Sequence, residues 1–131
     1  MKKVINLLSI ALIAFAFAAC SSSNSPQGVV KAYLTAMQNN DAQAMMQTFH
    51  FNKQMTDEEM DQFTQMAADK IAKQNEKKQG IESFEIGEVQ MAEDGQSATV
   101  PYVVHYGDGS QQKDTQKVLL IDGKWLLDSG K

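Results

Sequence analysis

Apolar positions recur with a helical period in the first stretch that follows residue 25. Ser25-Pro26 is typical of a helix start, because serine caps the first turn and proline is tolerated at the first helical position. The apolar positions within residues 29–37 then share one helical face. Asn39-Asn40 ends this helix, and Asp41 can cap a second, short one. The pattern therefore predicts two successive helices.

The longest predicted helix runs from Thr56 to about Gln79. Thr56 and Glu59 form a capping box at its start, and Gly80 can supply a left-handed stop at its end. Acidic residues gather in its first turn and lysines toward its end, so both groups complement the helix dipole. These lysines are Lys70, Lys73, Lys77 and Lys78. A basic surface for acidic lipid headgroups is the alternative interpretation of the lysines.

From Ile81 onward the pattern changes from helical to alternating, as expected of strands. Gly87 separates two stretches of opposite parity, which predicts a β-bulge. Residues 98–106 alternate regularly, and Gly107-Asp108-Gly109 and Asp122-Gly123 are turn sequences between strands. Three helices followed by a four-stranded antiparallel meander predict a single α+β domain over residues 26–131.

A leader precedes this domain. Met1-Lys2-Lys3 and the apolar stretch up to Ala19 have the layout of a secretory signal peptide over residues 1–19, too short for a membrane helix of about 20 apolar residues. The stretch ends Phe17-Ala18-Ala19-Cys20, and a polar tether completes residues 20–25. Here the chain resembles a bacterial lipoprotein precursor, with Phe17 where leucine is commoner. A cleaved signal with an incidental cysteine is the alternative.

The lipoprotein resemblance implies that Cys20 carries a diacylglycerol and an acyl chain such as palmitate, and that the leader is cut before it. Two or more acyl chains give stable anchoring, whereas one gives only marginal binding. At about 3.5 Å per residue the tether spans less than about 20 Å, so the domain would lie close to the membrane. The tether lacks the acidic residues of lipoproteins that reach an outer face. We therefore expect the periplasmic leaflet of the outer membrane.

The domain itself carries a second resemblance. Its markers are the helix from Ser25-Pro26, the short helix after Asn40-Asp41-Ala42, the long helix, and the ending Asp122-Gly123-Lys124-Trp125. In these features residues 26–128 resemble a small lipoprotein-borne domain of unknown function in the nuclear transport factor two-like superfamily, some members of which were labelled lumazine-binding. The resemblance implies that the three helices pack on a curved four-stranded sheet, and that the sheet forms a cone with an open mouth. It implies a pocket and leaves the ligand unnamed.

Composition excludes several classes of function. Cys20 is the only cysteine among 131 residues, so no disulfide can form within the chain. The formal charge of −4 opposes nucleic-acid binding, and the absence of arginine makes phosphorylated substrates poor candidates. His50 and His105 do not have the spacing of a metal motif. We expect neither a metal nor a cofactor.

Methionine is the unusual component, because six of the seven methionines after the leader lie on or beside the predicted helices. Filling of the core is one interpretation, and a soft hydrophobic cleft is the other. Met55 and Met66 lie off the apolar stripes and favour a cleft. The predicted pocket residues are Tyr33, Met37, Phe63, Met66 and Tyr102. We therefore expect a noncatalytic envelope domain that binds a small hydrophobic molecule, a peptide or another envelope protein, with a homodimer plausible for the superfamily.

The alternative function is a small cavity enzyme of isomerase-like or hydrolase-like type. Some enzymes of the nuclear transport factor two-like superfamily use a cavity carboxylate as base and a tyrosine hydroxyl as hydrogen-bond donor. If this chain resembles them in activity, its pocket should contain a buried carboxyl group with a raised pKa. The candidates are Tyr33, Tyr102 and Asp114, with Asp128 a poorer one. A third hypothesis has no pocket: the interior is filled by aromatic residues, and an exposed sheet face recruits a partner. The filling residues would be Phe49, Phe63, Phe84 and Trp125.

Overall fold

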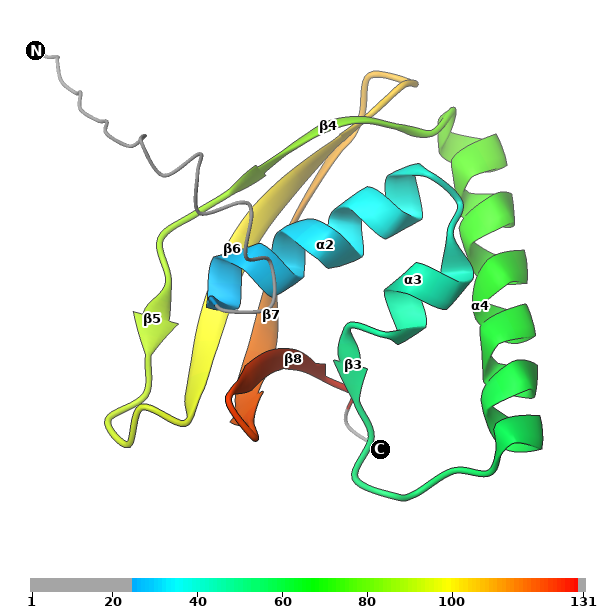
Figure 1. Cartoon of the computed structure of the whole chain (residues 1–131). Helices are drawn as coiled ribbons and strands as arrows, with labels where there is room; N and C mark the ends of the chain where they lie inside the picture. Colours follow the sequence, from blue (N-terminus) through cyan, green and yellow to red (C-terminus); the bar gives the residue numbers. More distant parts are fainter. Residues whose placement is uncertain (1–24, 130–131) are drawn as a thin grey trace, which may run out of the picture.

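A curved sheet forms one side of the domain in the computed structural model, which describes residues 25–129 (Figure 1). Its strands are β3 (Phe49–His50), β4 (Ile81–Ile86), β5 (Gln90–Met91), β6 (Ser97–Tyr106), β7 (Gln111–Ile121) and β8 (Lys124–Asp128). They follow the order β3-β8-β7-β6-β4, with β5 also paired to β6. Neighbours are antiparallel except β3 and β8, which are parallel. The predicted signal peptide and Cys20 lie outside the described residues.

The expected count of four strands was wrong, because the sheet formed by residues 25–129 has six. The stretch expected as one strand is divided at Gly87, whose N–H donates to the carbonyl of Pro101 at 2.8 Å. Since Pro101 has no N–H to offer in return, the ladder between β4 and β6 stops there and resumes as β5. The other addition is β3, which lies between the second and third predicted helices, where the sequence predicted no strand.

The described helices are α2 (Pro26–Gln38), α3 (Ala42–Met46) and α4 (Asp57–Lys78). Their starts agree with the sequence: the Ser25 hydroxyl accepts from the Gly28 N–H at 2.9 Å, and the Asp41 carboxylate accepts from Ala44. The Thr56–Glu59 capping box is present at the start of α4. Its left-handed stop begins one residue earlier than expected, at Gln79 with φ 65°. Local capping chemistry is therefore enough to place the helix starts.

The main core lies between α2 and the concave face of the sheet (Figure 1). Its most deeply buried side chains come from both layers: Val30 and Leu34 from α2, and Val100, Val118 and Leu127 from the sheet. A second, smaller cluster joins α3 to α4, and Met45, Met46 and Ile71 are among its buried members. α2 is thus the helix that covers the sheet.

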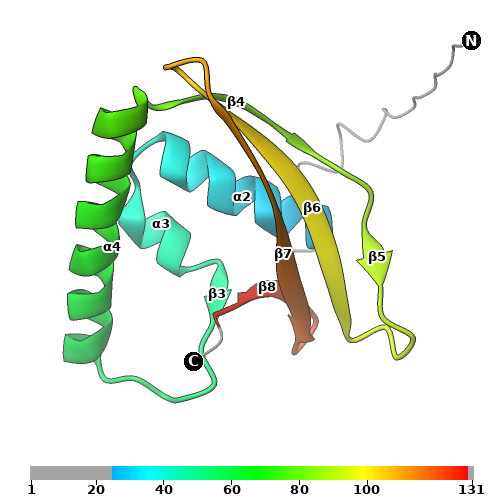
Figure 2. The same ribbon diagram turned by 180° about the vertical axis from the view of Figure 1, so that it is seen from behind.

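The expectation that all three helices pack on the sheet is corrected by the position of α4. Figures 1 and 2 show α4 standing beside the sheet, and of its 22 residues only Ile71 is buried. It reaches the sheet near its C-terminal end, where the Gln74 amide donates to the Tyr106 hydroxyl at 2.8 Å. None of the helices in residues 25–129 has the length and apolarity that a membrane crossing requires. The consequence of this arrangement is that one face of α4 is incompletely covered.

Candidate ligand-binding groove

Methionine and phenylalanine side chains of α3, β3 and α4 surround a hollow of about 290 Å³. Its lining consists of Met45, Met46, Phe49, Phe51, Phe63, Met66, Ala67, Lys70 and Ser129. Lys70 is the one charged residue of this lining. A surface of this composition suits an apolar ligand, because methionine side chains are flexible and adapt their packing to the ligand's shape.

A second hollow, of about 190 Å³, adjoins the first at Phe51 and Phe63, which line both. Its other lining residues are Lys53, Met55 and Glu59. The Lys53 ammonium lies 4.0 Å from the Glu59 carboxylate, and both side chains are exposed. We call the two hollows together the α4 groove. Apart from Ser129, its lining is apolar except for Lys70 in the larger hollow and the Lys53–Glu59 pair in the smaller one.

The sequence builds this groove from two local patterns. On α4, Glu59, Phe63, Ala67 and Lys70 follow one another at intervals of three or four residues, so they share one face of the helix. Phe49 and Phe51 form the opposite wall: the Phe51 ring centroid lies 6.2 Å from that of Phe49 and 6.2 Å from that of Phe63 on α4. Because α4 stands off the sheet, no further layer of described residues covers this face.

The structure brings only part of the predicted pocket together. Phe63 and Met66 line the α4 groove, and Met66 is 58% exposed. Tyr33 borders it through an edge-to-face contact with Phe49, at 5.6 Å between ring centroids. Met37 packs between the two core clusters, and Tyr102 lies on β6 against the main core. The predicted pocket residues therefore fall in two places.

Several groove residues were missed from the sequence. Met45, Met46, Phe49, Phe51 and Lys70 were not among the predicted pocket residues, although they line the larger hollow. The alternation of Phe49 and Phe51 around His50 is a strand pattern, and it was the available indication that this segment forms a wall. Met55, which was predicted to favour a cleft, lines the smaller hollow.

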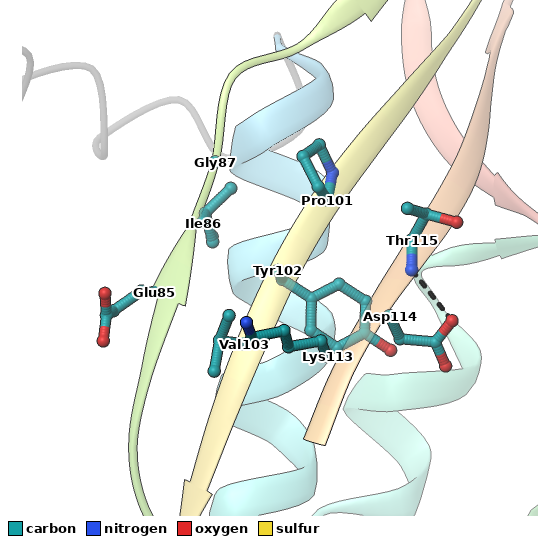
Figure 3. Close-up of a pocket in the computed structure, with 9 residues that line it drawn as sticks. All are labelled: Glu85, Ile86, Gly87, Pro101, Tyr102, Val103, Lys113, Asp114 and Thr115. Carbon is teal, nitrogen blue, oxygen red and sulfur yellow. Dashed lines mark hydrogen bonds between the residues drawn. The ribbon is translucent and has the colours of Figure 1, made fainter. Parts of the chain in front are cut away.

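Three of the four enzyme candidates, Tyr33, Tyr102 and Asp114, also lie near one another, whereas Asp128 lies at the end of β8 opposite His50. Burial raises the pKa of Tyr33 and of Tyr102 above the ordinary value, and the nearby Asp114 carboxylate raises both further. Asp114 lies opposite Tyr102 in the β6–β7 register, and Figure 3 shows the Tyr102 ring pointing toward β7. The Asp114 side chain is exposed and accepts a hydrogen bond from the Thr115 N–H at 2.8 Å. An exposed carboxylate lacks the desolvation that prepares a buried base.

A third hollow, of about 440 Å³, lies across β4, β6 and β7 at the Gly87 bulge (Figure 3). It is lined by Glu85, Ile86, Gly87, Pro101, Tyr102, Val103, Lys113, Asp114 and Thr115. Most of its surface is apolar, and three charged side chains, Glu85, Lys113 and Asp114, belong to its lining. It contains no group of three metal-ligating side chains, and none occurs elsewhere in residues 25–129.

A homodimer contact through the sheet remains a prediction.

Residues 18–128 match the model of a protein family described as a domain of unknown function, DUF4878. The chain belongs to this family. A solved structure similar to this DUF4878 chain is that of a proposed NTF2-like transpeptidase from Campylobacter jejuni, with a TM-score of 0.65 and 19% identity over 79% of this chain and 97% of that chain. A DUF4783 family protein from Bacteroides ovatus covers 74% of this chain and 86% of its own at 13% identity, with a TM-score of 0.49.

The similarity to the Campylobacter protein shows that the DUF4878 chain has an NTF2-like α+β fold with a curled sheet. The fold expected from the sequence is confirmed at this level. No curated protein matches the chain. Fold does not determine activity, because one fold carries many functions. The function must therefore be argued from the grooves and side chains of this domain.

Proposed function

We propose that this domain is a noncatalytic binding module that takes an apolar ligand into the α4 groove. We further propose that it is a lipoprotein, held through lipidated Cys20 on the periplasmic leaflet of the outer membrane. The groove supports the first statement, and the leader and its lone cysteine support the second. A module of this kind would work close to lipid, because the tether is short.

The observation that carries the binding proposal is the uncovered apolar face of α4. Phe63 and Ala67 are only half-buried and Met66 is exposed, although all three lie beside other apolar side chains. Burial of apolar surface contributes about 25 cal/mol per Å², so a ligand that covers this face gains free energy without rearranging the main core. The buried residues of the main core do not line the groove, and α2 already covers them.

The enzyme alternative has weaker support. A transpeptidase, the activity named for the Campylobacter protein, needs an activated nucleophile beside a base. The only cysteine precedes the domain in sequence, and Asp114 is exposed outside the α4 groove. We therefore favour binding over catalysis.

The test uses 1-decanol, an uncharged ten-carbon probe, and the chain from Ser21 onward, which contains every residue of both core clusters. Methyl NMR of the methionines reports its position. We expect the Met45, Met46 and Met66 methyl resonances to shift with saturation. Met91, which is 53% exposed on β5, serves as the internal control and should not move.

A pair of neighbouring substitutions makes the test specific. Ala67→Phe fills the groove, whereas Ala68→Phe places the same ring on an exposed position of α4. We expect Ala67→Phe to abolish the shifts and Ala68→Phe to leave them unchanged, with circular dichroism verifying that both variants fold. The proposal is overturned if 1-decanol leaves the groove methyl resonances unmoved, or if it moves Met91 equally.

A further inference from the structure

The two ends of the α4 groove differ in charge. At one end Lys53 and Glu59 form an ion pair, so their charges offset each other. At the other end Lys70 lines the larger hollow, and within residues 25–129 no carboxylate forms an ion pair with it. The apolar lining between these ends carries no charge. The groove therefore has one neutral end and one cationic end.

We propose that the ligand of the α4 groove is a fatty acid, a single alkyl chain with one carboxylate. This proposal rests on the proposed function and names the class of its ligand. The carboxylate pairs with the Lys70 ammonium, and the alkyl chain lies along Ala67 and Phe63 toward Met55. A hydrogen bond from an ammonium group to a carboxylate joins two charged groups, and such bonds are stronger than hydrogen bonds between neutral groups.

The dimensions of the groove suit one chain of moderate length. From Glu59 to Lys70 the face of α4 rises roughly 16 Å, at about 1.5 Å per residue. An extended alkyl chain of about ten carbons, with C–C bonds of ~1.5 Å, reaches most of that distance. A single chain of this length would occupy both hollows, of about 290 and 190 Å³, and contact the Phe51 and Phe63 rings that line both. A diacyl lipid would need room for a second chain beside it.

The lining also favours an alkyl chain over a peptide. A peptide brings backbone N–H and C=O groups that must find partners when they are buried. The lining between Lys70 and the Lys53–Glu59 pair consists of hydrocarbon, thioether and aromatic side chains, apart from Ser129. An alkyl chain has no polar groups that need hydrogen-bond partners in this lining.

Three probes that each contain a ten-carbon chain but differ in charge test the proposal: decanoate, 1-decanol and decyltrimethylammonium. Titrations followed by methionine methyl NMR give a dissociation constant for each. We expect decanoate to bind about tenfold more tightly than decyltrimethylammonium, which corresponds to about 1.4 kcal/mol. Lys70→Gln should weaken decanoate binding roughly tenfold and leave 1-decanol binding unchanged. Lys117→Gln, an exposed lysine on β7, is the matched control and should change neither.

The outcomes separate this proposal from the proposed function. If 1-decanol binds in the groove but decanoate and decyltrimethylammonium bind equally, the fatty-acid assignment is overturned and the apolar groove stands. The fatty-acid assignment is also overturned if Lys70→Gln and Lys117→Gln weaken decanoate binding to the same extent. If 1-decanol does not shift the groove methyl resonances, the binding module itself is overturned.

Discussion

The backbone N–H of Gly107 donates to the carbonyl of Gly80 at 2.9 Å, which joins the β6–β7 hairpin to the end of α4. The Asp108 N–H adds a bond to the carbonyl of Lys78 at 3.0 Å. A Cβ on Gly107 would collide with the carbonyl oxygen of Gln79, so the close approach requires glycine. The turn that the sequence predicted as a simple chain reversal is therefore an attachment point for α4.

We expect Gly107→Ala to destabilise the domain by about 1–3 kcal/mol, the usual cost of overpacking. The added methyl group meets backbone, which has little freedom to move away. Urea denaturation followed by Trp125 fluorescence measures the change. Gln111→Ala, at an exposed position just past the same turn, is the control and should stay within about 0.5 kcal/mol of the wild type. Equal stability of the two variants would contradict the attachment.

Asn75 holds the same helix at a second point. Its side-chain amide donates to the Met37 carbonyl at 3.1 Å and to the Asn40 side-chain oxygen at 2.7 Å. Asn75→Ala should therefore cost about 1–3 kcal/mol and speed amide hydrogen exchange throughout α4. Glu76→Ala changes the exposed neighbour and should leave exchange in α4 unaltered. If both variants exchange at the wild-type rate, the contact does not position the helix.

The raised pKa values of Tyr33 and Tyr102 predict a loss of stability in alkaline solution. Folding favours the protonated hydroxyls, so this contribution is complete below the unfolded pKa of about 10 and declines as pH rises from there through the folded values. Urea midpoints at about pH 9 and pH 11 measure the decline. The Tyr33→Phe, Tyr102→Phe double variant keeps every lysine and should decline less. An identical decline would refute the assignment to these tyrosines.

Helix starts were predictable because capping depends on neighbours in sequence. Ser25, Asp41 and Thr56 each accept a backbone N–H three residues on, an arrangement that the residue types alone indicate. The alternating strands were predictable for a related reason, since Val100 and Val104 repeat with the period of a strand and are buried. Both kinds of pattern are local.

The features that local patterns did not predict depend on residues far apart in the sequence. The division of the first strand depends on Pro101, which lies 14 positions after Gly87 and lacks the N–H that the bulge would need. β3 exists because Phe49 and His50 pair with the far end of the chain, in register with Leu127 and Asp128. No periodicity of one segment reports such pairings. The site could therefore be predicted only in part, through Phe63 and Met66.

The membrane anchor gives a last prediction, which concerns residues before the described domain. If Cys20 is lipidated, denaturing mass spectrometry of protein extracted from cells will find a mature chain that starts at Cys20 and carries added acyl mass. Each buried methylene contributes about 0.8 kcal/mol, so two or more chains should hold the protein on membranes through washes with concentrated salt. Cys20→Ser should lack the added mass.

Replacing residues 1–20 with the leader of an ordinary secreted protein should release a folded, soluble domain, which separates anchoring from folding. A wild-type chain that starts elsewhere, or that starts at Cys20 without acyl mass, would contradict the lipoprotein proposal and leave the α4 groove to be judged by the probe titrations alone.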